Sequence, residues 1–313
     1  MKVLVIADGL SKIKPEGDSS LAFIAEFLKK GISTFYGVSE ELFWETQNLW
    51  IPACEVRAQE KGKLPQLAPL TVQSIEEFSL VLIRKDPPFD ETYQKLCWLL
   101  EPYEEKIRMV NAPSVLLSHH EKMIPQQALL SGDLLVSDLI PSLITTSADR
   151  ARDFVHSLAS EQVVVKPFLG YQGNDVFLVG REDFLNRPDH YISMRGSWIV
   201  QPLRPEIRTS GDRRVFFFGG RYRGSFARIP KEGSIVSNLA QGGSGQVREL
   251  DPTETSVIER LEKFLKRKNI VLAGADLIGG KVNEVNVTSP TGFVTYEKLH
   301  GKNLAKEFVE SLL

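Results

Sequence analysis

The first 85 residues alternate between short apolar runs and a segment with helical spacing, and this alternation constrains the fold more than any other feature. Residues 2–8 and 32–38 are apolar runs, and residues 79–84 form another. Between the first two, residues 20–30 place apolar side chains three and four positions apart. Strands buried on both faces read as continuous apolar runs, whereas an apolar stripe indicates an amphipathic helix. The pattern therefore predicts a doubly wound α/β unit.

Polar residues follow the predicted strands at the positions where such sheets bind ligands, which are the carboxyl ends of the strands. Asp8 and Arg84 end two strands, and Asp18, Ser19 and Ser20 precede the first helix. Arg84 is soon followed by two consecutive prolines that fix the backbone, so its guanidinium can bind a carboxylate in a fixed orientation. The alternative interpretation is a proline-stiffened loop with surface charges.

Composition excludes several classes of protein. The chain has 313 residues, enough for two or three packed units, and a formal net charge of −2 without a long basic run, which argues against nucleic acid as a partner. No segment approaches the roughly 20 apolar residues of a membrane span, and the N-terminus lacks signal-peptide features. We therefore predict a cytoplasmic protein. Cys54 and Cys97, the only cysteines, are predicted to be free thiols.

The middle of the chain carries a lysine within an apolar run. Lys166 follows three valines and precedes a proline. Because an unpaired buried lysine is costly, we expect it to point into a site that holds an anion. Residues 170–174 form a glycine loop whose backbone N–H groups could close over phosphates, which by itself is weak evidence. The remaining predicted elements are strands at 141–144, 162–168, 197–202 and 215–218, and helices at 114–125, 147–160, 253–269 and 302–313.

Basic and glycine-rich segments follow. Arginines occur at positions 213, 214, 221, 223 and 228, and some of them belong to a solvated face, the commoner fate of arginines on a sheet. Residues 238–245 are rich in glycine, and we predict that they form a mobile lid.

Residues 274–292 read as two short strands joined at Gly279 and Gly280. A two-residue loop would pair Asp276 with Asn283. A three-residue loop over positions 279–281, with a glycine at positive φ, would instead pair Asp276 with Glu284. We expect the three-residue loop, because it places apolar side chains together on the reverse face.

In that register Asp276 and Glu284 share one face with Asn286, opposite Gly274. Carboxylate and amide oxygens suit Mg²⁺, which usually shares its ligand set with substrate phosphates. The alternative is an ordinary hairpin with solvated polar side chains, and spacing alone leaves both interpretations open.

Several motifs occur in one order along almost the whole chain, namely residues 84–90, Asn111 with Glu121 and Lys122, residues 165–167, Glu206 with 211–214, residues 227–230, 238–245, and Asp276 with 284–292. Together they resemble bacterial glutathione synthetases of the ATP-grasp superfamily. The resemblance implies a Rossmann-like N-terminal domain at 1–120, an ATP-grasp subdomain with the glycine loop at 121–200, and a subdomain with metal site and lid at 201–313.

The resemblance also implies ATP with Mg²⁺ or Mn²⁺ and a set of site residues. Metal ligands would be Asp276, Glu284 and Asn286, while Arg214 and Arg228 would stabilise the reacting carboxylate and phosphate. The implied nucleotide ligands are Lys122, Lys166, Gly170, Gly173, Gln201, Leu203 and Asp212. The implied substrate contacts are Asp18, Ser19, Ser20, Arg84, Asn238, Ser289, Thr291 and Gly292.

The implied activity is that of an ATP-dependent carboxylate–amine ligase that works through an acyl phosphate, glutathione synthesis from γ-glutamylcysteine and glycine first of all, in a homo-oligomer. The chain departs from the family at Leu117 and His120, where Arg and Asn are usual, at residues 169–173, where a glycine is lost, and at Val236, where an arginine is usual. Two alternatives follow: a ligase for another peptide or amino-acid pair, and a nucleotide-binding protein that has lost catalysis.

Overall fold

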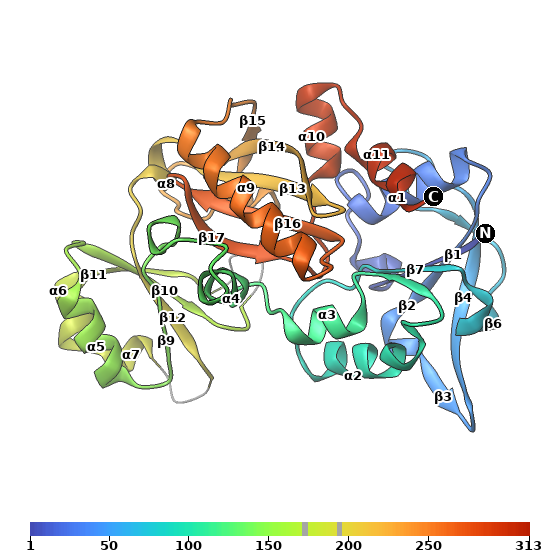
Figure 1. Cartoon of the computed structure of the whole chain (residues 1–313), viewed down its shortest axis with the longest axis horizontal. Coiled ribbons are helices and arrows are strands. Elements are labelled where there is room, and N and C mark those ends of the chain that lie inside the picture. The colour runs from blue at the N-terminus through green and yellow to red at the C-terminus, as the bar shows by residue number, and fades with distance from the viewer. Residues whose placement is uncertain (171–174, 193–195) are drawn as a thin grey trace.

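The protein is built on three β-sheets (Figure 1), and a computed structural model describes residues 1–170, 175–192 and 196–313. The N-terminal sheet has the order β3-β4-β2-β1-β7-β8, with β5 and β6 paired to β4. Its strands are β1 (Lys2–Ala7), β2 (Ser33–Val38), β3 (Phe43–Glu45), β4 (Asn48–Ala58), β5 (Gln66–Leu67), β6 (Thr71–Ser74), β7 (Leu80–Ile83) and β8 (Arg108–Val110). Its helices are α1 (Ser19–Lys29), α2 (Glu91–Leu100) and α3 (Pro113–Ser118). Strands β2, β1, β7 and β8 are parallel, as the doubly wound pattern predicts.

The second sheet is antiparallel and has the order β11-β10-β12-β9. Its strands are β9 (Leu143–Thr145), β10 (Gln162–Pro167), β11 (Phe177–Gly180) and β12 (Trp198–Pro202), and its helices are α5 (Ala148–Ser157), α6 (Arg181–Asn186) and α7 (Pro188–Tyr191). Ser147 caps α5, because its side chain accepts a hydrogen bond from the Arg150 N–H.

The third sheet has the order β15-β14-β13-β16-β17. Its strands are β13 (Asp212–Phe218), β14 (Arg221–Ile229), β15 (Ser244–Gln246), β16 (Leu272–Ile278) and β17 (Lys281–Asn286), accompanied by α4 (Ile124–Leu130), α8 (Glu206–Thr209), α9 (Pro252–Arg267), α10 (Phe293–His300) and α11 (Leu304–Leu312). The apolar stripe of α9 shares a core with Ala275, Leu277, Val285 and Val287. The predicted apolar reverse face of the hairpin is thus confirmed, and the polar residues face the other way.

Two features join the N-terminal part to the third sheet. Helix α11 packs against α1 (Figure 1). The rings of Phe23 on α1 and Phe308 on α11 lie 4.7 Å apart between centroids. Asn111 follows β8, and its side-chain amide binds Leu272 O at 2.7 Å and Val287 O at 2.6 Å. Its Oδ1 accepts hydrogen bonds from the N–H groups of Val271 and Leu272. The amide therefore fixes the start of β16 and the end of β17 against the N-terminal sheet.

The structure corrects one predicted helix and shows where the predicted domain boundary at residue 200 falls. The helix predicted at 114–125 is two helices, and Lys122 lies in the turn between them. Pro125 sits in the first turn of α4, where it has no N–H for a bond to the preceding turn, so a continuous helix is interrupted there. The predicted boundary at residue 200 falls inside β12, and the three-domain division stays a prediction.

Two further expectations concern the thiols and the membrane. Cys97 is buried and Cys54 half-buried, and both are free thiols. Within the described ranges, no helix combines the length and the apolar character needed to cross a bilayer.

Candidate active site

A cleft of about 1060 Å³ is lined by residues from all three sheets. It collects most of the predicted site residues. The predicted residues that line it are Asp18, Ser20, Arg84, Lys122, Lys166, Gly170, Gln201, Leu203, Asp212, Arg214, Arg228, Asn238, Glu284, Asn286, Ser289, Thr291 and Gly292. Ser19 and Asp276 are buried without lining it, and Gly173 lies outside the described residues.

The β16–β17 hairpin has the expected pairing but not the expected loop. Asp276 lies opposite Glu284, yet Ile278 pairs with Lys281, so only two glycines form the turn. Both have positive φ, 54° at Gly279 and 70° at Gly280, which is the requirement of the tight hairpin turn of type I′. The register shifts after Asp276 through a bulge on β17. The three-residue loop was therefore wrong, because the extra residue is accommodated in the strand instead.

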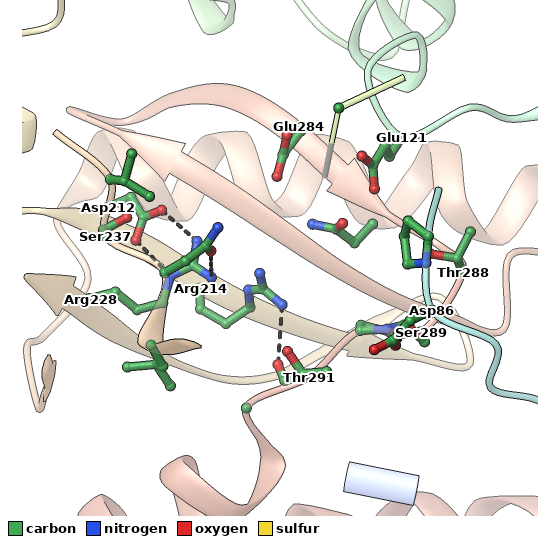
Figure 2. A pocket seen from close by; sticks show the side chains of 18 of the residues that line it. Asp86, Glu121, Asp212, Arg214, Arg228, Ser237, Glu284, Thr288, Ser289 and Thr291 are labelled. Atoms are coloured by element: carbon green, nitrogen blue, oxygen red, sulfur yellow. Dashed lines mark hydrogen bonds and ion pairs between the residues drawn. The ribbon is translucent and has the colours of Figure 1, made fainter. Parts of the chain in front are cut away.

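Asp276 is held by two arginines. Its Oδ1 lies 2.7 Å from Arg214 Nε, and its Oδ2 lies 3.1 Å from Arg214 Nη2 and 2.8 Å from Arg228 Nη2. Arg228 also binds Asp212, with Nε 2.8 Å from Oδ1 (Figure 2). Burial raises the pKa of Asp276, but the two arginines outweigh it and hold that pKa below its usual value. Acidic and basic side chains therefore alternate in the order Asp212, Arg228, Asp276 and Arg214. These ion pairs fix the two guanidinium groups at the cleft.

The groups that could hold a metal ion are oxygen donors on β17. Glu284 and Asn286 line the cleft, and Nδ2 of Asn286 is buried without a hydrogen-bond partner, so the protein leaves this amide unsatisfied. Both oxygens of Asp276 are bound to arginines. Within the described chain no three His, Cys, Asp or Glu side chains gather as a metal site. Mg²⁺ is commonly held by one or two carboxylates together with phosphates, and Glu284 with Asn286 fits that role.

Glu121 is a cleft carboxylate to which sequence reasoning gave no role. Its backbone oxygen accepts a hydrogen bond of 3.0 Å from the Val285 N–H, which fixes it beside β17. Figure 2 shows Glu121 and Glu284 on the same side of the cleft. Burial first, and then the charge of Glu284, raise the pKa of Glu121 to about 7. Its position directly before Lys122 in the sequence was the only available signal.

The two predicted phosphate-binding lysines are both buried at the cleft. Lys122 Nζ donates to the backbone oxygens of Phe168, at 3.0 Å, and of Gly170, and lies 3.3 Å from Glu121 Oε1. Lys166 Nζ donates to Asn283 Oδ1 at 3.0 Å, and burial lowers its pKa against the opposing charge of Glu284. Both lysines therefore lie beside β17, Lys166 through Asn283 and Lys122 through its neighbour Glu121.

His120, one of the departures expected from the family pattern, contacts Lys122, whose N–H donates to the His120 Nδ1 at 3.4 Å. Its ring stacks on Phe168 with centroids 4.4 Å apart. Burial and the neighbouring Lys122 lower the pKa of His120 to about 4. The imidazole is therefore neutral near pH 7 and serves as an apolar contact.

The end of β12, where two of the implied nucleotide ligands lie, is partly hydrogen-bonded within the protein. The N–H of Leu203 donates to Gln162 O at 2.9 Å, and the Gln201 side chain donates to Ser142 Oγ at 2.8 Å. The nucleotide-binding role of Gln201 and Leu203 stays a prediction.

Arg84 links the N-terminal sheet to Pro290, which follows β17. Its Nε donates to Ser20 Oγ at 3.0 Å and its Nη2 to Pro290 O at 3.1 Å, while Nη1 is buried without an acceptor. Ser289 and Thr291, on either side of Pro290, are also hydrogen-bonded. The Ser289 hydroxyl donates to Asp86, and Arg214 Nη1 donates to Thr291 O at 3.1 Å (Figure 2).

The predicted lid lies against Arg228 and β14. Arg228 Nη1 is 3.4 Å from Asn238 Oδ1, and β15 pairs with β14. The cleft is lined here by Ile235, Val236, Ser237, Asn238 and Leu239, so the lid side of the cleft begins three residues before the predicted lid. This stretch brings apolar and neutral polar groups to the cleft and no charged one.

Comparisons with known proteins agree with this arrangement. Residues 133–301 match the family described as prokaryotic glutathione synthetase, ATP-grasp domain, and residues 1–116 match prokaryotic glutathione synthetase, N-terminal domain. The chain is 30% identical over 312 residues to a glutathione synthetase of Rhodopseudomonas palustris, covering 97% of this chain and 96% of the relative. It is 31% identical over 323 residues to one of Ralstonia nicotianae, covering 100% and 95%.

Solved structures are similar in fold. D-cycloserine synthetase DcsG has a TM-score of 0.69 at 16% identity, covering 99% of this chain and 98% of that one. The macrocyclase MdnC bound with precursor peptide MdnA from Microcystis aeruginosa MRC has a TM-score of 0.66 at 13% identity, covering 100% and 99%. The predicted architecture, a Rossmann-like domain followed by an ATP-grasp fold, is confirmed. By its sequence matches, the chain belongs to the prokaryotic glutathione synthetase family and is an ATP-dependent ligase of the ATP-grasp superfamily.

Proposed function

We propose that the protein is a glutathione synthetase, which joins the cysteinyl carboxylate of γ-glutamylcysteine to the amine of glycine with ATP hydrolysed to ADP and phosphate. The observation that carries the proposal is the convergence of four buried cations on one cleft. Lys122 and Lys166 approach from one side, and Arg214 and Arg228 are fixed on the third sheet. Such a set suits a reaction in which both steps build negative charge on oxygens.

In the first step the peptide carboxylate attacks the γ-phosphorus and ADP leaves, which gives an acyl phosphate. Lys122 and Lys166 neutralise charge on the phosphate oxygens, because fixed ammonium groups in a water-poor site need no reorganisation. Arg214 and Arg228 hold the attacking carboxylate near the phosphoryl group. Asp276 keeps both guanidinium groups oriented before substrate arrives, so positioning contributes to the rate.

In the second step the glycine amine attacks the acyl carbon, and phosphate leaves from the tetrahedral intermediate. The developing oxyanion needs donors of fixed direction, and Arg214 and Arg228 supply them. The lid side chains Val236 and Leu239 exclude water from the acyl phosphate, which water would otherwise hydrolyse.

A divalent cation accompanies ATP in ligases of this superfamily, and we propose Mg²⁺ or Mn²⁺ here. Glu284 and Asn286 are the cleft residues that would hold it, with Asp276 as the further ligand that the family pattern predicts. The ion supplies charge neutralisation at the phosphate oxygens when it is bound.

The direct test incubates the full chain with ATP, Mg²⁺, γ-glutamylcysteine and glycine, and measures phosphate release and the tripeptide by mass spectrometry. We expect both products in equal amounts. Phosphate release no higher than in the sample without γ-glutamylcysteine would overturn the assignment.

A second candidate is a ligase of the same type with another amine. The neutral lid face of Ile235, Val236 and Leu239 favours it, because this stretch offers no charge to the carboxylate of an amino-acid acceptor. A panel of amines, each supplied with ATP and γ-glutamylcysteine, separates the two. Higher kcat/KM for an amine without a carboxylate than for glycine would support the second candidate.

We also propose that the protein is a cytoplasmic homo-oligomer with small-molecule substrates. Light scattering coupled to gel filtration measures the oligomeric mass, and cell fractionation measures the location. A monomeric mass at micromolar concentration would contradict the first statement, and recovery outside the cytoplasmic fraction the second.

A further inference from the structure

The bulge on β17 turns two consecutive side chains toward the cleft. The pairing register shifts after Asp276, and Asn283 is the residue of β17 that has no partner on β16. In a regular strand, consecutive side chains point to opposite faces. Here Asn283 and Glu284 both line the cleft. Val282 and Val285, on either side of this pair, belong to the apolar core. The bulge therefore brings Asn283 to the cleft face, which strict alternation with Glu284 would not do.

Lys166 is the side chain that Asn283 meets in the cleft. On β10, Val163 and Val165 pack in the core of the second sheet, whereas Val164 and Lys166 line the cleft, as alternation along a strand requires. The Lys166 Nζ donates a hydrogen bond to Asn283 Oδ1 at 3.0 Å. Because β10 belongs to the second sheet and β17 to the third, this bond crosses from one sheet to the other.

The acceptor of this buried ammonium group is neutral. Lys166 is 8% exposed, and no carboxylate of the described residues lies at ion-pair distance from it. Burial lowers the pKa of Lys166, and the charges of Glu284, Glu121 and Asp276 oppose that shift, so carboxylates lie nearby without pairing with it. An ammonium group has three donors. Asn283 uses one of them, cancels none of the charge, and leaves two donors for a ligand.

We propose that Asn283 is a positioning residue for Lys166, which holds the ammonium group at the cleft with its charge available to phosphate oxygens. A desolvated ammonium group needs a hydrogen-bond partner, and the amide oxygen supplies one. A carboxylate at the same place would also satisfy it, but it would form an ion pair that competes with the phosphate. Without an acceptor at position 283, Lys166 is free to pair with Glu284 or Glu121. The inference rests on the proposed function for the role of Lys166 as a phosphate ligand.

Asn283→Asp separates positioning of a charge from simple hydrogen bonding. This variant keeps the shape and an acceptor oxygen, and it adds a negative charge beside Lys166. We expect the Kd for ATP to rise at least about tenfold, while the urea midpoint of unfolding without nucleotide stays the same or rises. Binding is measured on the full chain in EDTA, so that the new carboxylate cannot act by holding a metal ion. If Asn283 served only as an acceptor, ATP affinity would equal that of wild type, and this result would overturn the proposal.

The matched control for this variant is Asn48→Asp. Asn48 is exposed at the start of β4 and does not line the cleft, so the same exchange adds the same charge away from Lys166. We expect an ATP affinity equal to that of wild type. A loss as large as that of Asn283→Asp would show that the net charge of the protein is responsible, and it would overturn the positioning role.

A double-mutant cycle tests whether Asn283 acts through Lys166. Asn283→Leu removes the acceptor and keeps a similar volume, and we expect the Kd for ATP, again in EDTA, to rise about fivefold or more. In the Lys166→Met background the same exchange is expected to cause no further rise, because the group that Asn283 positions is already absent. Losses that add in the double variant would show an effect on β17 that is independent of Lys166, and would overturn the inference.

The outcomes separate this inference from the proposed function, because ATP binding needs neither the acid nor the amine. The expected changes in ATP affinity without any formation of the tripeptide would leave the role of Asn283 standing and overturn the glutathione assignment. Tripeptide formation by the wild type together with additive losses in the cycle would overturn the role of Asn283 and leave the proposed function standing.

Discussion

Asp276 binds Arg214 through both carboxylate oxygens, at 2.7 Å from Nε and 3.1 Å from Nη2. The second of these oxygens also lies 2.8 Å from Arg228 Nη2. One buried carboxylate therefore fixes the two guanidinium groups to which the mechanism assigns charge stabilisation. A metal ion bound by Asp276, as the family pattern predicts, would compete with this role, so we expect metal binding and arginine placement to be linked in this site.

The first prediction concerns this carboxylate. Asp276→Ala leaves two buried arginines with one partner fewer, which costs about 3–5 kcal/mol of unfolding free energy, and we expect kcat to fall by about 100-fold or more. Urea denaturation and phosphate release measure the two effects. Asp276→Asn keeps the shape and is expected to lose less stability. Unchanged turnover in Asp276→Ala would overturn the mechanism.

A second prediction uses the pH dependence of stability. The pKa of Glu121 is raised from 4.5 to about 7 in the folded protein, so the folded state binds the proton more tightly. This contribution to stability is complete below pH 4.5 and is lost as the pH rises through about 7. We expect the unfolding free energy, measured in EDTA, to fall by about 1–3 kcal/mol from this group between pH 5 and 8. Glu121→Gln removes that slope, whereas the exposed Glu105→Gln keeps it. An identical slope in wild type and Glu121→Gln would show that another group titrates.

A third prediction concerns Lys122, which contacts the glycine-loop backbone at Phe168 and Gly170. Lys122→Met removes the charge and keeps most of the length, so we expect the Kd for ATP to rise at least about tenfold. Equilibrium binding of a fluorescent ATP analogue measures it. Lys95→Met, an exposed lysine on α2, is the control that leaves the affinity unchanged. Equal affinity in wild type and Lys122→Met would remove Lys122 from the nucleotide site.

A fourth prediction concerns Gly274, which lies opposite Asn286. A Cβ at this position would stand 3.0 Å from Pro290 Cβ and 3.2 Å from Arg214 Nη1. We expect Gly274→Ala to displace the Arg214 guanidinium and lower kcat about tenfold, because a small misplacement of a catalytic group has a large effect. Gly180→Ala, where a Cβ meets nothing within 4 Å, is the control. A kcat equal to that of wild type would show that Arg214 has room to shift.

Part of the fold was accessible to sequence reasoning because it depends on local patterns. Apolar runs and helical spacing identified β1, α1, β2 and β7, and the stripe on α9 was correct within a few residues. The helix predicted at 114–125 failed where a proline in the first turn of α4 outweighed the apolar spacing. The pairing register of the β16–β17 hairpin was harder to predict from the sequence. Two glycines favoured a tight turn, and a bulge on β17 that the spacing does not encode still brought Asp276 opposite Glu284.

The sequence by itself determined the order of the elements, the family and most of the residues that meet in the cleft. Tertiary structure decided which charges are paired and which are left for a ligand. Asp276 is bound to arginines from β13 and β14, and Arg84 is bound to Pro290 far along the chain, which leaves Nη1 without an acceptor. Glu121 became a candidate site residue only once the structure placed it in the cleft beside Glu284. Whether a buried charge is paired depends on atoms brought together by the packing of three sheets, and the spacing of residues along one segment carries no record of that packing.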